Sequence, residues 1–235
     1  MKRIHTTLIW FMFVVLLTGC LYPEERRQQL DQLPDHIQRV EAAVKVYKEN
    51  NEGWLPYLYR EDEVKFTTKY LVDFRRLQGY VGEIPPTAFE KGGYFIYVLT
   101  DVEKGPKVRL FDLRVNDQIG RVQPVVLTYL QKNKILPIKE KIDEDLYTID
   151  FEKIKMDPVT IPSPYSPTDL PLLIDKKGKV YIDYRTEVMK KVQKSKEVIS
   201  PEMDLRFWLS EDSFYVPAFS PPMKLKDQEP VFELE

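Results

Sequence analysis

Short blocks of sequence recur in the same order in two halves of this 235-residue chain, and this repetition constrains its fold more than any other feature. The block RVEAAVKVY at 39–47 matches RVQPVVLTY at 121–129. Further pairs follow in order: Leu55-Pro56 with Leu136-Pro137, Glu61-Asp62-Glu63 with Asp143-Glu144-Asp145, 70–74 with 147–151, Ile84-Pro85 with Ile161-Pro162, and 110–114 with 181–185. A preserved order with small deletions is expected of a diverged tandem duplication. We therefore predict two related units, although each block is short enough to match by coincidence.

Each unit predicts a helix, a long irregular stretch and a β-hairpin. Both helices carry one apolar stripe at helical spacing, formed by Ile37, Val40, Val44 and Tyr47 in the first and by Ile119, Val122, Val126 and Tyr129 in the second. Pro34 suits the first turn of the first helix. In the second helix Asn116 or Asp117 could cap the start, and Pro124 either kinks the helix or marks its true beginning.

The hairpins are predicted from β-rich segments that flank turn residues. Gly92-Gly93 predicts a turn before the first of these strands, and a third helix is expected after the second hairpin, at about 186–197. The predicted strands and turns are 94–99 and 108–113 around Gly105, and 172–174 and 180–184 around Gly178, while 205–209 and 214–219 add a short helix or strand.

Together these elements predict an α+β fold. Two small hairpins cannot each bury a stable core, so we expect them to join one small antiparallel sheet that the helices cover. The predicted segments are repeat unit 1 at 34–115, repeat unit 2 with its following helix at 116–197, and an aromatic and proline-rich C-terminal extension at 198–235. In element order each unit resembles the pseudopilin-like modules of bacterial surface proteins, without the long apolar N-terminal helix of pilins.

The first 20 residues predict where the protein works. Lys2 and Arg3 precede residues 8–17, which have no polar side chain. As a helix this run covers roughly 15 Å, about half of a bilayer core, which suits a signal peptide better than a membrane span. The run leads into Leu17, Thr18, Gly19 and Cys20, which resemble a bacterial lipobox.

The lipobox resemblance implies that residues 1–19 are removed as a signal peptide and that the Cys20 thiol carries a diacylglycerol, followed by a tether at 20–33. Two acyl chains are enough for stable membrane anchoring. The alternatives are an ordinary signal peptide or an uncleaved anchor with a chance cysteine. In its Lys-, Glu- and Tyr-rich composition the chain is also similar to membrane lipoproteins of Bacillus-like Gram-positive bacteria, which implies a position on the outer side of the cytoplasmic membrane.

Charge, cysteine content and motifs exclude several classes of function. The chain has 35 basic and 37 acidic residues, a balance that does not favour nucleic acid as a partner. Cys20 is its single cysteine, so the folded part has no disulfide. The motifs CxxC, HExxH, GxSxG, GxGxxG and GxxxxGK[ST] do not occur, and His36 is the one histidine beyond the signal. We therefore expect no catalytic residue, no metal site and no cofactor.

Repeated carboxylates are the remaining candidates for chemistry. Asp73 and Asp150 occupy matched positions, as do Asp112 and Asp183. Paired acids can cleave glycosides or bind calcium, and the two acidic triplets could also bind calcium, although they lack the spacing of an EF-hand loop. Repetition in both units favours structural roles instead. We expect the first pair to cap short helices and the second pair to bond Arg114 and Arg185 across the sheet.

A lysine cluster on the predicted third helix is a further candidate. Its members could touch anionic lipid beside the anchor, or could simply be solvated while Val188 and Val192 face the core. The cluster consists of Lys190, Lys191, Lys194 and Lys196.

These features predict a membrane-anchored extracytoplasmic lipoprotein, a non-enzymatic binding or interaction module of the cell envelope whose partner is an envelope protein or a transporter. One alternative is a solute-binding lipoprotein of a membrane transporter. A deep cleft between the units, lined by Tyr57, Tyr80, Tyr94 and Tyr165, would favour it. A second alternative is a carboxylate-dependent envelope hydrolase, which would need two facing acids in a cleft.

Overall fold

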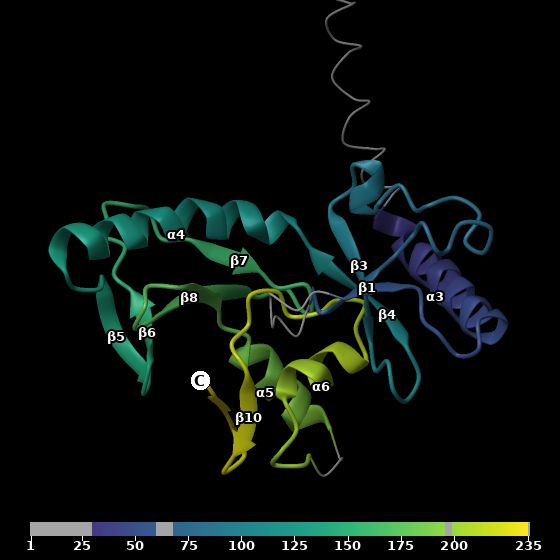
Figure 1. Ribbon diagram of the computed structural model, residues 1–235. Helices are drawn as coiled ribbons and strands as arrows, with labels where there is room; N and C mark the ends of the chain where they lie inside the picture. The colour runs from purple at the N-terminus through teal and green to yellow at the C-terminus, as the bar shows by residue number, and fades with distance from the viewer. Residues whose placement is uncertain (1–29, 60–67, 196–198, 235) are drawn as a thin grey trace, which may run out of the picture.

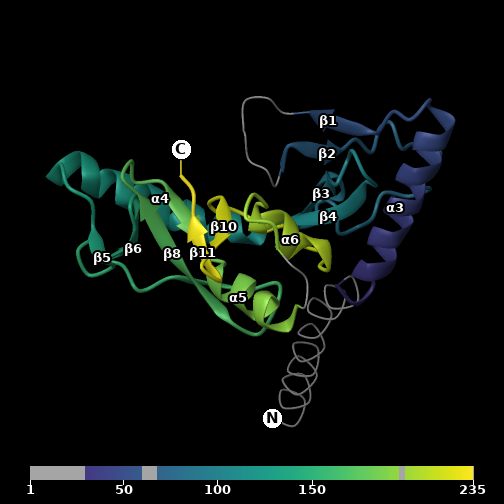
Figure 2. The same ribbon diagram turned by 90° about the horizontal axis from the view of Figure 1, so that it is seen from below.

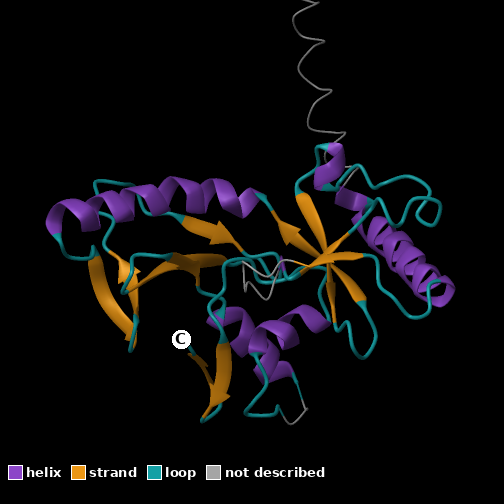
Figure 3. Ribbon diagram, viewed as in Figure 1, coloured by secondary structure: helices purple, strands orange, loops and turns teal. Residues whose placement is uncertain are grey.

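The computed structural model describes residues 30–59, 68–195 and 199–234 (Figure 1). The predicted signal peptide, the lipobox residues Leu17, Thr18, Gly19 and Cys20, the first acidic triplet and Lys196 lie outside these residues. Within the described parts of the chain, no helix has the length and apolar character needed to cross a bilayer. The described fold is α+β, as predicted, with helices packed on small antiparallel sheets (Figure 3).

The first lobe consists of one helix packed against a four-stranded antiparallel sheet with the order β1-β2-β3-β4 (Figure 2). Its core joins the predicted stripe of the helix, including Ile37, Val40 and Val44, to Tyr97 and Leu110 of the sheet, and all five side chains are almost fully buried. The elements are α3 (Leu33–Asn50), β1 (Tyr57–Tyr59), β2 (Tyr70–Val72), the 3-10 helix η2 (Phe89–Lys91), β3 (Phe95–Thr100) and β4 (Lys107–Asp112).

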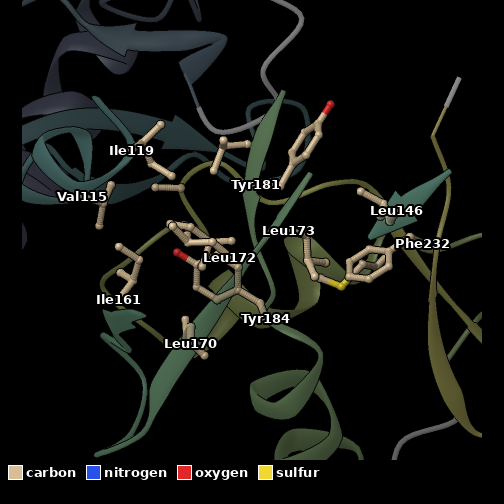
Figure 4. Packing of buried hydrophobic residues seen from close by; sticks show 14 of the residues in the cluster. Val115, Ile119, Leu146, Ile161, Leu170, Leu172, Leu173, Tyr181, Tyr184 and Phe232 are labelled. Atoms are coloured by element: carbon tan, nitrogen blue, oxygen red, sulfur yellow. The ribbon is translucent and has the colours of Figure 1, made fainter. Parts of the chain in front are cut away.

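The second lobe contains the longest described helix, a five-stranded antiparallel sheet and the C-terminal elements. Strand β8 is its centre, because β6, β7 and β9 all pair with it. The elements are α4 (Arg114–Asn133), β5 (Ile138–Asp143), β6 (Leu146–Ile149), β7 (Thr160–Pro162), β8 (Asp169–Asp175), β9 (Val180–Ile182), α5 (Arg185–Lys194), α6 (Leu205–Glu211), β10 (Met223–Lys226) and β11 (Glu229–Phe232). Figure 4 shows part of its core, to which α4, β6, β8 and β11 contribute Val115, Leu146, Leu172 and Phe232.

The prediction that both hairpins join one sheet is wrong. Helix α4 begins at Arg114, two residues after β4 ends, and continues through Pro124 to Asn133. A helix of 20 residues spans about 30 Å, so it carries the chain away from the first sheet before the second begins. Pro124 therefore does not mark the start of this helix.

The predicted cap of α4 at Asn116 or Asp117 is also wrong. The first helical residue is Arg114, and its backbone N–H donates to the carboxylate of Asp112 at 2.9 Å. The buried stripe of α4 does contain Ile119, Val122 and Val126, as predicted. The apolar periodicity thus predicted the buried face of α4 correctly, but it did not predict where α4 begins.

The two sheets connect their strands in the same way over the matched blocks. The order β1-β2-β3-β4 corresponds to β5-β6-β8-β9, and β7 is an addition to the second sheet. The backbone N–H of Asp73 donates to the carbonyl of Pro56 at 2.8 Å, and that of Asp150 donates to Pro137 at 2.7 Å. The tandem duplication itself stays a prediction.

One segment of the C-terminal extension, 214–219, bonds both sheets. The backbone N–H of Leu110 donates to the carbonyl of Phe214 at 2.8 Å, and that of Val216 donates back to Leu110 at 3.0 Å. Further along, the N–H of Ile182 donates to the carbonyl of Phe219 at 3.0 Å. The segment 214–219 therefore pairs with β4 of the first sheet and with β9 of the second.

Candidate functional site

A cavity of about 480 Å³ opens between the 164–166 loop, α5 and α6. We call it the lysine pocket, because it collects ionisable side chains from segments that are far apart in sequence. Its chemically distinctive lining residues are Tyr165, Ser166, Glu187, Lys190, Lys191 and Lys194. The three described lysines of the predicted cluster thus line a cavity together with the carboxylate of Glu187, the phenol of Tyr165 and the hydroxyl of Ser166.

Helix α5 explains why these lysines share one side. Glu187, Lys190, Lys191 and Lys194 are separated by three, four and seven residues, which places them on one helical face. Val188, the residue after Glu187, is fully buried, as predicted. The carboxylate of Asp183 starts the helix by accepting the backbone N–H of Arg185 at 3.0 Å.

A buried carboxylate forms the floor of the lysine pocket. The Glu187 side chain is 3% exposed, and its Oε1 accepts the hydroxyl of Ser166 at 2.7 Å. The ammonium of Lys190 lies 3.3 Å from the same oxygen and donates to Ser166 and Thr168 at 2.7 and 2.5 Å. A charge that is removed from water must be paired and hydrogen-bonded, and these contacts meet that need for Glu187.

Ser166 and Lys190 lie at the separation of a serine–lysine catalytic dyad, but their hydrogen bonds differ from one. A dyad lysine must accept the proton of the serine hydroxyl. Here the Ser166 hydroxyl donates to Glu187, and the Lys190 nitrogen donates to three oxygens. The pair therefore belongs to a hydrogen-bonded group that also includes Glu187 and Thr168.

The two other lysines of the pocket differ in their contacts. The Lys191 ammonium lies 4.6 Å from the ring centroid of Trp208, donates to the Trp208 carbonyl and pairs with Asp212 at 3.1 Å. Lys194 has no hydrogen-bond or ion-pair partner among the residues described. The pocket therefore presents one uncommitted ammonium group beside a second that is held over an aromatic ring.

Tyr165 lines another part of the lysine pocket, with Tyr184 packed behind it. The Tyr165 hydroxyl donates to the carbonyl of Tyr215 at 3.2 Å, and its ring meets that of Tyr184 edge-on at 6.0 Å. Burial raises the pKa of Tyr165 well above its usual value, and it raises the pKa of Tyr184 in the same direction. Both phenols are therefore neutral across the physiological range.

The four tyrosines predicted to line an inter-unit cleft lie in separate contacts. Tyr57 packs edge-on against Tyr70, and Tyr80 packs against Tyr47 of α3. Tyr94 is 40% exposed directly before β3, and Tyr165 lines the lysine pocket. The arrangement that would favour a solute-binding cleft is not formed by these residues.

The repeated carboxylates hold local structure. Asp73 accepts the backbone N–H of Arg75 at 3.0 Å, and Asp150 accepts that of Lys153 at 3.2 Å. The backbone N–H of Lys153, followed by its ammonium group, lowers the pKa of Asp150. The predicted capping of short helices is wrong, because the segments that follow Asp73 and Asp150 are turns.

Asp112 and Asp183 do bond Arg114 and Arg185, but the predicted pairing across the sheet is wrong. Each arginine lies two residues after its aspartate at a strand-to-helix junction, with closest contacts of 2.5 and 2.7 Å. Asp204 and Arg206 repeat the arrangement at the start of α6, at 2.6 Å. A two-residue separation lets one carboxylate accept the helix N–H and the guanidinium together.

The second acidic triplet, Asp143-Glu144-Asp145, lies at the turn between β5 and β6. Asp143 accepts the backbone N–H of Phe232 at 3.3 Å, and Asp145 pairs with Lys176 at 2.7 Å. No cluster of three or more potential metal ligands occurs in the described parts of the chain. The triplet therefore joins neighbouring segments in this structure.

His36 is buried where α3 meets the loop before η2. Its Nδ1 lies 3.3 Å from the Thr87 hydroxyl, which in turn lies 2.8 Å from the hydroxyl of Tyr97. Burial, followed by the positive charge of Arg39, lowers the pKa of His36 below its ordinary value of 6.5, and Asp35 partly opposes this. The folded protein thus favours the neutral imidazole.

We expect the folded state to lose stability as the pH falls from 7 towards 5. The unfolded chain binds a proton at His36 before the folded chain does, so the loss begins near pH 6.5 and is no steeper than about 1.4 kcal/mol per pH unit, the limit for one proton. Urea unfolding of wild type and His36→Gln at several pH values measures it. A wild-type slope that persists in the variant would assign the effect to other groups.

Residues 33–112 match the YphF family N-terminal domain. The match begins at the first residue of α3 and ends at the last residue of β4, so it covers the first lobe and about a third of the chain. No curated protein and no solved structure matches the chain. The lysine pocket lies outside the region similar to the YphF N-terminal domain.

Proposed function

We propose that this protein is a membrane-anchored lipoprotein of the extracytoplasmic cell envelope that acts as a non-enzymatic binding module. The observation that carries the binding role is the lysine pocket. In this pocket Glu187, Ser166 and Lys190 bond one another, whereas the ammonium group of Lys194 can bind a ligand. A site with fixed walls and one uncommitted cation suits recognition of an anionic group on an envelope component or partner protein.

The anchor in this proposal rests on the order of positive charge, apolar run and lipobox at residues 1–20. Replacing Cys20 with serine should abolish lipid attachment, because serine lacks the thiol that accepts the diacylglycerol. In a Gram-positive host we expect the wild-type protein in the membrane fraction and Cys20→Ser in the medium. Mass spectrometry of the N-terminal peptide gives the lipid directly. An unmodified wild-type Cys20 would contradict the anchor.

The binding role can be tested separately by photo-crosslinking in intact cells. We would place the crosslinking amino acid at Ser213, which lines the lysine pocket, and in a control at Lys132, which is exposed on α4. We expect an adduct from position 213 that disappears when Lys194→Gln is added. Equal adducts from both positions, or an adduct that Lys194→Gln does not change, would contradict a ligand in this pocket.

A further inference from the structure

We propose that the end of the molecule where α3 begins rests on the bilayer surface, with Phe89 as the side chain that enters the interface. This inference rests on the proposed lipid anchor at Cys20. The surface, called here the anchor-side face, consists of Leu30, Pro86, Phe89, Lys91 and Tyr94. Figure 1 shows the short helix η2 at this end of the molecule, near the start of α3.

The anchor-side face presents apolar and aromatic side chains to solvent. Phe89 is 60% exposed, and Leu30 and Tyr94 are each 40% exposed. The contact between Thr87 and His36, in the first turns of α3, places the loop that carries Phe89 beside the start of that helix. Aromatic rings at an apolar–aqueous boundary are typical of membrane interfaces.

The loop holds Phe89 outward in a fixed position. Its neighbour Ala88 is fully buried, and the Ala88 carbonyl accepts the N–H groups of Lys91 and Gly93, both at 2.9 Å. Gly92 adopts a left-handed conformation with a φ of 79°. A Cβ on Gly93 would lie 2.1 Å from the backbone of Thr87, so only glycine fits. Exposure of Phe89 therefore follows from a constrained turn.

The length of chain before α3 points to the bilayer as the occupant. Ten residue steps separate Cys20 from Leu30, and a chain covers at most about 3.6 Å per residue, so Leu30 lies within about 36 Å of the anchored residue. Trp54 is 70% exposed, but it follows the far end of α3, about 27 Å further along the helix axis. Leu30 on the anchor-side face is thus nearer to the anchored residue along the chain than Trp54 is.

Charges on this face identify the kind of bilayer contact. Lys91 is exposed at the end of η2, but Asp31, Asp35 and Glu90 are exposed nearby. Acidic groups would repel an anionic membrane, so aromatic insertion and not lipid charge must supply the contact. We therefore expect it on a purely zwitterionic bilayer.

Labelled cysteine variants test this orientation. In the lipidated protein the sulfur of Cys20 is blocked, so Phe89→Cys and Ile135→Cys each add one free thiol for an environment-sensitive fluorophore. Both native side chains are 60% exposed, and Ile135 follows the far end of α4, which makes it a matched control. On phosphatidylcholine vesicles we expect emission from position 89 to shift to shorter wavelength and emission from position 135 to stay unshifted.

A second variant keeps Phe89 in place. A label on Lys91→Cys should show the same shift, and adding Phe89→Ser should remove it. Water-like emission from positions 89 and 91 in protein whose lipid is verified by mass would overturn the orientation and leave the anchor intact. A mass without lipid would instead overturn the proposed anchor and this inference with it.

Discussion

Replacing Arg109 with methionine should lower the free energy of unfolding by about 3–5 kcal/mol, because several carbonyl acceptors lose a charged donor at a cost of about 1–3 kcal/mol for each buried acceptor. Arg109 is 7% exposed on β4. Its guanidinium donates to the carbonyls of Ser210 and Glu211 in the last turn of α6, at 2.8 and 2.9 Å, and to Val108 at 2.8 Å. Methionine fills similar space but removes the charged donor from all three carbonyls, of which the Ser210 carbonyl keeps the backbone N–H of Ser213.

The matched control for this prediction is Arg121→Met. Arg121 is exposed on α4, and among the residues that the structure describes it bonds only the Gln118 side chain, at 3.4 Å. We therefore expect a change within about 0.5 kcal/mol. Urea unfolding followed by circular dichroism, in a Cys20→Ser background that removes the lipid, compares the two. Hydrogen exchange should also show faster opening of α6 in Arg109→Met. Equal unfolding midpoints for the two variants would contradict the role assigned to Arg109.

Replacing Lys190 with methionine should lower the free energy of unfolding by about 1–3 kcal/mol, because a buried charged acceptor loses its partner. Glu187 is 3% exposed and would keep only the hydroxyl of Ser166. The expected loss is smaller than for Arg109, because Lys190 is 37% exposed and water can partly replace it.

A double variant distinguishes loss of the Glu187–Lys190 ion pair from loss of packing by the Lys190 side chain. Glu187→Gln removes the buried charge, so Glu187→Gln/Lys190→Met should be more stable than Lys190→Met alone, with a coupling of at least about 0.5 kcal/mol. Lys132→Met, which changes an exposed lysine on α4, is the control for a helical lysine. Additive effects of the two pocket substitutions would show that Glu187 and Lys190 do not stabilise each other.

The parts of the fold that could be predicted are those set by local periodicity. The buried faces of α3 and α4 follow from apolar spacing, and both central hairpins form near their predicted positions. Pairing between distant strands could not be predicted in this way, because alternation does not say which strand is the neighbour. The split into two sheets depends on the length and continuity of α4, which Pro124 obscured.

The β10–β11 hairpin was missed for a different reason. Its prolines suggested an irregular tail, yet Pro230 lies within an edge strand, where a missing N–H is tolerated. The turn uses Asp227 and Gln228 with φ values of 50° and 68°. This conformation resembles the tight turns that join two strands, but it normally selects asparagine or glycine. The sequence therefore lacked the usual signal.

The sequence predicts which α5 residues of the lysine pocket lie together, but not which other residues join them. Helical spacing from Glu187 to Lys194 was available, and it predicts one shared face. Ser166 and Trp208 could not be assigned to the same site, because the turn after β7 and the return of the chain through α6 bring them there. Side chains that meet through tertiary packing leave no fixed spacing in one sequence.

The segment 214–219 has a consequence for the order in which this protein can fold. Until it is synthesised, the backbone groups of Leu110 and Ile182 that bond it have no strand beside them. Exposed strand edges invite pairing with other chains. For a chain that crosses a membrane unfolded, as the proposed signal peptide requires, a closing segment near the C-terminus delays completion of the fold until transport is nearly finished. Truncation before residue 214 should then damage both sheets, including the lobe that ends at residue 112.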